Sequence, residues 1–413
     1  MLVMFMLQPV KGTRDFVGEE AVMLQFLIDV IRRTFERYGF TPLETPAFEY
    51  LELLTKKGGK DIEKEIYSFK DKSGRELGLR FDLTVPMARV VASKKLKKPF
   101  KRYQIGKVWR YDQPQAARWR EFMQADIDIV GSSSPLADLE CLKPVVDIFK
   151  ELGLDFFIKI NNRKILESVV RSFGIEDITT AFRIIDKQDK IGWDEVKKEL
   201  KKNFPDKDID ALIDTIKKND LSVLLLDEEG EQGLSELKEL LDLGKIVGID
   251  DFLRIDMSLV RGLEYYTGNV FEIMAGLDVS VGGGGRYDNL TEVLGGEKEP
   301  ATGISIGVYR LLKVLQDKKF VPPKKKKVYV APIGETRAEA LQILDKLRAN
   351  NITSEIDVMN RSLSKQLEAT DADIVVIVGP KDLSNKQVTI RDMKTGKEKK
   401  AAIDKIIEEV MKA

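Results

Sequence analysis

The chain has 413 residues, and its 68 Lys plus Arg balance its 68 Asp plus Glu. This length suffices for two or three domains, and a net charge of zero means that any nucleic-acid site must be a local patch. The chain contains no histidine, which excludes Ser-His-Asp and Cys-His catalysis and His-ligated metal sites. The single cysteine, Cys141, excludes an internal disulfide and favours a reducing, cytoplasmic setting. No run of residues approaches the roughly 20 apolar residues of a membrane span, so we expect no membrane partner.

The first predicted element is an amphipathic helix over residues 19–38. Apolar residues recur at helical spacing from Leu24 to Tyr38, and Gly39 is a favourable terminator. Residues 39–49, which contain two prolines, are predicted to be extended.

Residues 78–89, GLRFDLTVPMAR, form an apolar, strand-like run with a single carboxylate, Asp82, followed by Thr84. A lone Asp in such a run is more often a cap or turn residue than a ligand. The residues themselves leave both roles open.

Residues 102–131 predict two strands joined by a long, charged loop. In the second strand, Gln124, Asp126 and Asp128 alternate with apolar residues, which predicts one apolar face and one acidic, amide-bearing face. The loop is rich in arginine, whose donors match phosphate oxygens two at a time. The hairpin could therefore hold a polyphosphate beside a cationic, polar small molecule, although an ordinary exposed hairpin would have the same pattern.

A strand at residues 155–161 and a helix at 163–173 precede a helix-rich stretch at about residues 175–250. This stretch is rich in Lys and Asp, and it contains no motif to which chemistry can be assigned.

Three later segments combine glycine with arginine or tyrosine. In SLVRGLEYYTGNVFEI (258–273), an arginine beside a glycine can approach a phosphate, and the hydroxyls of Tyr265 and Tyr266 could hydrogen-bond an imidazole. Residues 280–290 contain four consecutive glycines whose spacing matches neither a P-loop nor a dinucleotide-binding motif. Such a run lets the backbone pack against a ligand, although it more often makes a turn. Residues 301–315 predict a glycine-rich strand that runs into a helix.

The composition changes at PPKKKK (322–327), which predicts a linker. Beyond it, strand-like and helix-like segments alternate, which predicts a small, mostly parallel α/β domain. We therefore divide the chain into residues 1–323, which include the insertion at about 175–250, and residues 324–413.

Several of these segments resemble motifs of class II aminoacyl-tRNA synthetases, in the form found in histidyl-tRNA synthetases. Residues 9–16 are similar to the N-terminal signature of that family, residues 39–46 to motif 1, residues 102–131 to motif 2 and residues 301–315 to motif 3. RGLEYYTG and GGRYD resemble the two histidine-specific segments. The resemblance implies an α+β catalytic domain with an antiparallel sheet flanked by helices, and a C-terminal α/β anticodon-binding domain. It also implies a homodimer built through motif 1 and an insertion that approaches the tRNA acceptor stem.

The resemblance assigns roles to individual residues. Arg110 and Arg261 match the catalytic arginines that act on the α-phosphate. The implied ATP-binding residues are Arg110, Asp112, Arg118, Phe122 and Arg310. The implied histidine-binding residues are Asp82, Thr84, Arg110, Gln124, Asp128, Arg261, Tyr265 and Tyr266. Asp126 shares a strand face with Asp128 but has no family match and is not included, and Tyr309 stands where an acidic residue often precedes the motif 3 arginine.

These matches imply a histidine–tRNA ligase that forms histidyl-adenylate from ATP and histidine and transfers the histidyl group to tRNA(His). Mg²⁺ is implied as a cofactor, with no ligands predicted. The alternative is a non-catalytic relative, such as the regulatory subunit of ATP phosphoribosyltransferase. It is disfavoured because the set of four arginines is complete and the C-terminal domain is present.

Overall fold

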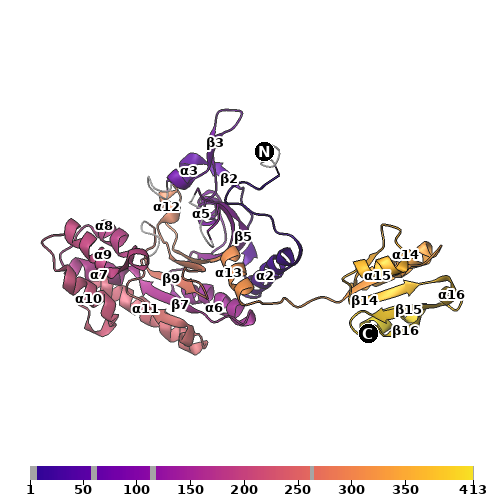
Figure 1. Ribbon diagram of the computed structural model, residues 1–413. Coiled ribbons are helices and arrows are strands. Elements are labelled where there is room, and N and C mark those ends of the chain that lie inside the picture. Colours follow the sequence, from indigo (N-terminus) through magenta and orange to yellow (C-terminus); the bar gives the residue numbers. More distant parts are fainter. Residues whose placement is uncertain (1–6, 57–62, 112–117, 261–264, 413) are drawn as a thin grey trace. The chain divides into compact units, whose positions relative to one another are not determined.

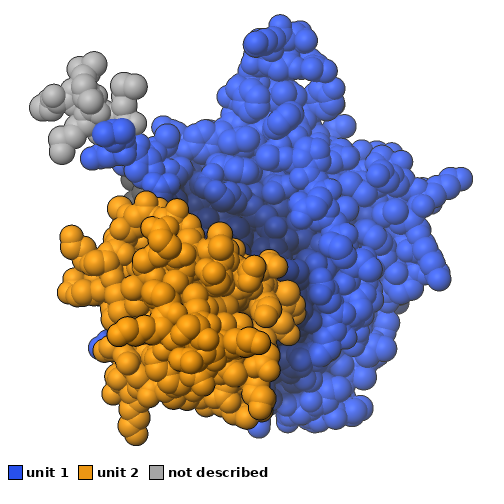
Figure 2. Space-filling view, turned by 90° about the vertical axis from the view of Figure 1, so that its right-hand side faces the viewer, with its two compact units in different colours: residues 1–321 blue, residues 322–413 orange. Residues whose placement is uncertain are grey.

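A computed structural model of the chain describes residues 7–56, 63–111, 118–260 and 265–412. The chain has two compact units, residues 1–321 and 322–413, which are coloured separately in Figure 2. The division falls at the start of the PPKKKK segment, where the change in composition predicted a linker. Each unit has its own apolar core.

Among the described residues, an eight-stranded sheet forms the centre of the first unit (Figure 1), with the strand order β1-β5-β6-β11-β10-β9-β7-β8. The strands are β1 (Thr41–Pro42), β5 (Phe100–Trp109), β6 (Glu121–Val130), β7 (Phe157–Asn162), β8 (Leu253–Ile255), β9 (Asn269–Met274), β10 (Gly282–Arg286) and β11 (Ala301–Gly307). The inner pairs are antiparallel, as predicted, whereas the pairs at both edges, β1 with β5 and β7 with β8, are parallel.

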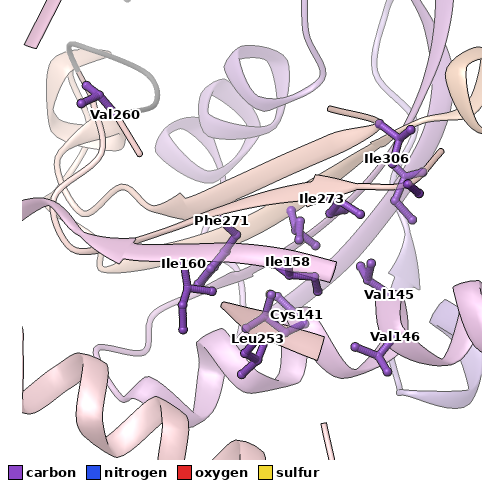
Figure 3. Packing of buried hydrophobic residues seen from close by; sticks show 14 of the residues in the cluster. Cys141, Val145, Val146, Ile158, Ile160, Leu253, Val260, Phe271, Ile273 and Ile306 are labelled. Atoms are coloured by element: carbon purple, nitrogen blue, oxygen red, sulfur yellow. The ribbon is translucent and has the colours of Figure 1, made fainter. Parts of the chain in front are cut away.

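Helices α2 (Gly18–Arg37), α6 (Pro135–Glu151) and α13 (Val308–Asp317) pack their apolar faces into the same core as this sheet. Helix α2 confirms the first predicted helix, and Gly39 beyond its end has the left-handed φ of 76° that favours glycine. Figure 3 shows part of the core, with Cys141 of α6 in one cluster with Ile158 and Leu253. Burial raises the pKa of the Cys141 thiol well above its ordinary value, so this residue acts as a small packing residue.

The segment around Asp82 corrects one prediction. Only β4 (Glu76–Leu79) is a strand, and it pairs with β2 (Phe48–Tyr50) and β3 (Ser68–Lys70) in a small sheet beside α3 (Leu51–Thr55). The rest of the apolar run forms α5 (Thr84–Ser93), which packs against α12 (Leu290–Val293). The helix begins there because Oδ1 of Asp82 accepts a hydrogen bond from the backbone N–H of Val85 at 3.0 Å. Pro86 fits the first turn, where backbone N–H groups have no helical partner.

The predicted insertion is helical, and it consists of α8 (Ile178–Ile185), α9 (Gln188–Asn203), α10 (Ile209–Lys218) and α11 (Glu228–Ile246). In Figure 1 these helices group with α7 (Arg163–Ser172) beside β7 and β9. Helix α11 packs against α6 and α7, and its buried Leu237 and Leu240 join the core beneath the sheet. The insertion is therefore continuous with the first unit.

The second unit contains a five-stranded sheet with the order β13-β12-β14-β15-β16 in the described part of the chain. Its elements are β12 (Lys327–Pro332), α14 (Arg337–Ala349), β13 (Thr353–Ile356), α15 (Leu363–Ala369), β14 (Ile374–Val378), α16 (Pro380–Leu383), β15 (Gln387–Asp392), β16 (Glu398–Ala402) and α17 (Ile406–Lys412). Strand β12 is parallel to both neighbours, but β14, β15 and β16 pair antiparallel. The prediction of a mostly parallel sheet is thus wrong for one half, because β15 pairs antiparallel with β14 and the charged EKKAA segment adds an unpredicted antiparallel strand, β16.

Candidate active site

A cavity of about 240 Å³ lies over the central strands β6, β10 and β11 of the first unit. Residues of these three strands line it together with residues from the start of α5, the β5–β6 hairpin and the start of α13. The residues that were predicted from the sequence and line this cavity are Asp82, Thr84, Arg110, Arg118, Phe122, Gln124, Asp128, Tyr265, Tyr266 and Arg310. The other predicted residues, Asp112 and Arg261, lie outside the described part of the chain.

Asp128 is held at the cavity by a buried ion pair. It lies opposite Arg102 in the β5–β6 ladder, and the two side chains, 4% and 0% exposed, approach to 2.5 Å. The hydroxyl of Tyr287, which follows β10, donates to Oδ1 of Asp128. Burial, together with the negative charge of Asp128, raises the pKa of Tyr287 well above its ordinary value, so the phenol keeps its proton and remains a donor. Two donors, one on the neighbouring strand β5 and one that follows β10, thereby orient the Asp128 carboxylate.

A second hydrogen-bonded group lies on the same face of the sheet and consists of Gln124 and Asp126 of β6 and Ser305 of β11. Nε2 of Gln124 donates to Oγ of Ser305 at 2.8 Å, and the Ser305 hydroxyl bonds to the Asp126 carboxyl. Asp126 is 3% exposed, and burial raises its pKa to about 7. Within the part of the chain that the structure describes, Oδ1 of Asp126 and Oε1 of Gln124 are buried without a hydrogen-bond partner. Both residues line the cavity, so the two oxygens are available to a ligand.

Glycines allow close packing under the cavity. Gly303 of β11 lies opposite Asp128, and a Cβ at this position would lie 2.1 Å from Oδ1 of Asp128. A Cβ at Gly284 of β10 would lie 2.0 Å from the carbonyl oxygen of Gly303. The four consecutive glycines belong to strand β10 rather than to a turn, and the close approach of the β11 backbone requires the lack of a side chain at Gly284.

Three arginines reach the cavity from separate elements. Arg110 follows β5, its Nε donates to the carbonyl oxygen of Phe81 at 3.0 Å, and its guanidinium carbon lies 5.3 Å from the ring centre of Phe122. Arg310, in the first turn of α13, donates from Nη1 to the carbonyl oxygen of Ser280 at 2.8 Å. Arg118 lines the cavity from the β5–β6 hairpin. Three guanidinium groups around one cavity are suited to a polyphosphate, and the carboxylates of β6 are suited to a cation.

Asp82 and Thr84 occupy the junction between the loop after β4 and helix α5. The hydrogen bond from Val85 shows that Asp82 serves as a cap, one of the two roles that the sequence left open. Both residues also line the cavity, so the cap holds a carboxyl group beside the ligand space. Its role as a ligand stays a prediction.

Tyr265 and Tyr266 separate this cavity from a second one of about 580 Å³, which they also line. Their ring centres are 4.3 Å apart. Further residues that line the second cavity are Lys56, Arg163, Lys164, Glu167, Glu229, Gln232, Thr267, Asn289, Leu290 and Val293. The insertion helix α11 and helix α7 thus contribute to a space that borders the first cavity.

The family model for histidyl-tRNA synthetase matches residues 12–311, and the model for the anticodon binding domain matches residues 327–413. The chain belongs to the histidyl-tRNA synthetase family. It is 39% identical over 424 residues to a histidine–tRNA ligase of Pyrococcus furiosus, with 98% of each chain covered. The crystal structure of a histidyl-tRNA synthetase from Nostoc sp. has a TM-score of 0.83 and 32% identity, and the alignment covers 98% of this chain and 99% of that chain.

A structure from Bacillus halodurans, described as an ATP phosphoribosyltransferase regulatory subunit/histidyl-tRNA synthetase, has a TM-score of 0.76. Its identity is 24%, and the alignment covers 88% of this chain and 96% of that chain, so this likeness concerns the fold alone. The full-length similarity to curated ligases confirms the predicted family, the predicted fold class and the prediction that the chain is an enzyme of this family.

The sequence patterns did not identify some of the residues at the cavity of this member of the histidyl-tRNA synthetase family. Asp126 was excluded for lack of a family match, although its alternation with Gln124 and Asp128 was the signal that places it on the same face. Arg102 and Tyr287 were missed because nothing in their own segments indicates that Asp128 is their partner. Ser305 carries no sequence signal other than its place in a glycine-rich strand.

Tyr309, which stands where the family often has an acidic residue, belongs to an aromatic group at the edge of the cavity. Its ring centre lies 4.8 Å from that of Phe16 and 5.9 Å from that of Trp119. The carbonyl oxygen of Gly12 accepts a hydrogen bond from the backbone N–H of Arg120 at 2.8 Å. Residues 9–16, which match the N-terminal signature, are thereby attached to the β5–β6 hairpin.

In the described ranges of the chain, no group of three or more Cys, Asp or Glu side chains is placed to hold a metal ion. The described residues therefore do not fit a metal held by the protein alone. No helix among the described residues is long and apolar enough to cross a membrane.

Proposed function

We propose that this chain is a histidine–tRNA ligase that converts histidine and ATP to histidyl-adenylate and diphosphate, and then transfers the histidyl group to the 3′-terminal adenosine of tRNA(His). The observation that carries the proposal is the convergence of Arg110, Arg118 and Arg310 with the acidic face of β6 on one cavity. Such a cavity offers a site for a triphosphate beside a site for a cationic amino acid.

The side chains available suit adenylate formation without a histidine residue. The carboxylate of the substrate is itself the nucleophile, so the chain needs to position it and to stabilise negative charge on the α-phosphate. Arg110 is expected to contact both the carboxylate and the α-phosphate, with Arg261 as its partner by family match. Arg118 and Arg310 would neutralise the outer phosphates, to which Mg²⁺ bound by ATP would add its charge.

The adenine would lie near Phe122 and Asp112, in agreement with the family match of both residues. Phe122 lines the cavity beneath the Arg110 guanidinium, where a planar base can stack on the aromatic ring.

The amino-acid side chain would be selected by Asp128 together with Tyr265 and Tyr266, which address the imidazole nitrogens. Asp128 is suited to this task because Arg102 and Tyr287 hold its carboxylate in one orientation. A buried polar pocket rejects apolar isosteres strongly, since its own groups would be left unpaired. Gln124, Asp82 and Thr84 would bind the α-amino end.

The remaining parts of the chain would serve the tRNA. The second unit, which matches the anticodon binding domain family, would read the anticodon of tRNA(His). The second cavity, next to the insertion, would admit the 3′ end of the tRNA, because Tyr265 and Tyr266 border both spaces. The chain would act as a cytoplasmic homodimer built through motif 1.

Exchange of radioactive diphosphate into ATP, measured with each of the twenty amino acids, tests this function. We expect exchange with histidine only, and we expect charging of tRNA(His) under the same conditions. Exchange with another amino acid would refute the assignment. Binding of histidine without exchange would favour the alternative, a regulatory relative, whose fold is similar.

A further inference from the structure

One carboxyl group on the floor of the first cavity has no role in the predicted histidine-binding set. Asp126 is 3% exposed, and among the described residues its Oδ1 has no hydrogen-bond partner. Of the nearby guanidinium groups, Arg80 donates to the oxygens of Thr45, and Arg102 pairs with Asp128 through Nη2. The Nε and Nη1 atoms of Arg102 are buried without a hydrogen-bond partner among the described residues, so neither donates to Asp126. A buried acceptor without a donor is unfavourable, so this oxygen is a place where a ligand donor would stabilise the complex.

The groups around Asp126 form a set of acceptors. Nε2 of Gln124 donates to Ser305, which leaves the amide oxygen Oε1 as an acceptor. In the described part of the chain, Oε1 is also buried without a hydrogen-bond partner. Asp82 lines the same cavity, and it lies close enough that its charge acts on Asp126. The three acceptors from Asp126, Gln124 and Asp82 match the three donors of an ammonium group.

The order of residues along β6 indicates which end of the substrate they meet. Alternate residues of a strand are about 6.6 Å apart, a distance comparable to that between the ammonium group and the ring nitrogens of histidine. With the imidazole at Asp128, the ammonium group of the same molecule therefore reaches Asp126 and Gln124. Asp128 is less suited to the ammonium group, because Arg102 already supplies it with a positive charge.

We infer that Asp126 binds the α-ammonium group of the substrate amino acid, together with Asp82 and Gln124, and thereby lets the site distinguish an amino acid from an analogue without that group. The inference rests on the proposed function and adds a specificity-determining residue to it. Ser305 supports this arrangement by holding both Gln124 and Asp126.

Proton release on histidine binding is a second quantity that tests the role of Asp126. Burial raises its pKa to about 7, Arg102 lowers it, and Asp128 and Asp82 raise it. Arg80 also interacts with Asp126, but burial lowers the pKa of that guanidinium. A bound ammonium group favours the ionised carboxylate, so histidine binding at pH 7 should release roughly half a proton. At pH 8.5 the carboxyl is already ionised, and the release should vanish.

Isothermal titration calorimetry in buffers of different ionisation enthalpy measures both affinity and proton release. The ligands are histidine and β-imidazolyl-lactate, in which a hydroxyl replaces the ammonium group. The chain contains no histidine, so no imidazole of the protein contributes to the release. For the Asp126→Asn variant, we expect histidine binding to weaken by about 10- to 100-fold, the loss of one hydrogen bond to a charged group. Binding of β-imidazolyl-lactate should change by less than about threefold.

A matched control is Asp251→Asn, which changes an exposed carboxyl far along the sequence, and it should leave both affinities and the proton release unchanged. Equal weakening of both ligands in Asp126→Asn would overturn the inference, as would equal proton release in the variant and the parent protein. The parent protein alone supplies a further test, since equal proton release with both ligands at pH 7 would also overturn it. A parent protein that does not bind histidine would instead refute the proposed function.

Discussion

The substitution Gly303→Ala tests whether the position of Asp128 is set by close packing between strands. Gly303 lies opposite Asp128 in the β6–β11 ladder, and its new Cβ would lie 2.1 Å from Oδ1 and 2.7 Å from Cγ of Asp128. An ordinary contact between carbon and oxygen is about 3.3 Å, so the carboxylate must move by roughly 1 Å. It cannot do so without loss, because it is bound by Arg102 and Tyr287.

The expected cost follows from these contacts. Overpacking a buried site costs about 1–3 kcal/mol, and loss of one hydrogen bond to a charged group costs about 1.5–3 kcal/mol. Alanine gains only about 0.5–1 kcal/mol over glycine in a strand, so the steric effect dominates. Because the unfolding entropy grows with size, a net loss of about 3 kcal/mol in the unit of residues 1–321 would lower Tm by roughly 4–5 °C. The displaced carboxylate should also raise KM for histidine by about 10- to 100-fold.

Differential scanning calorimetry and diphosphate exchange with varied histidine and ATP measure these effects. The control is Gly379→Ala, since the nearest atom to its new Cβ is 3.8 Å away and its φ of −118° suits alanine. We expect the control to keep the Tm and both KM values of the parent. If Gly303→Ala matched the control in Tm and in KM for histidine, the packing argument would be refuted.

Three further predictions concern the roles of single groups and of the two units. Arg110→Ala should slow adenylate formation by roughly 100-fold or more, because one preorganised positive group is lost; a near-normal exchange rate would reject its role. Asp126→Asn should have a higher Tm than the parent at pH 8. Because the pKa of Asp126 is raised to about 7 in the folded protein, its buried carboxyl is neutral at low pH, and its contribution to stability is lost as the pH rises through 7. The difference should shrink towards pH 5, and calorimetry that shows no pH dependence would contradict the burial argument. Residues 1–321 alone should form adenylate but charge tRNA(His) poorly, and unchanged charging would refute an anticodon role for the second unit.

Much of the first unit was predictable because the patterns involved are local. Helix α2 follows from its apolar spacing, and the acidic face of β6 follows from strict alternation of side chains. The run around Asp82 was predicted wrongly because a single side-chain cap, to the N–H of Val85, converts its second half from strand to helix. Strand β16 was missed because its Lys-rich sequence has little strand character, and its structure depends on pairing with β15.

Composition and motif alone excluded histidine chemistry, located the arginines and indicated the family. The folded chain was needed to show that Arg102 and Tyr287 hold Asp128, that Gly303 must lack a side chain, and that Asp126 is buried with an acceptor available to a ligand. The reason is that alternation specifies which face a side chain occupies, whereas its partner depends on the register between strands that are distant in the sequence. Burial and pKa depend on that register too, because they are set by everything that packs around the group.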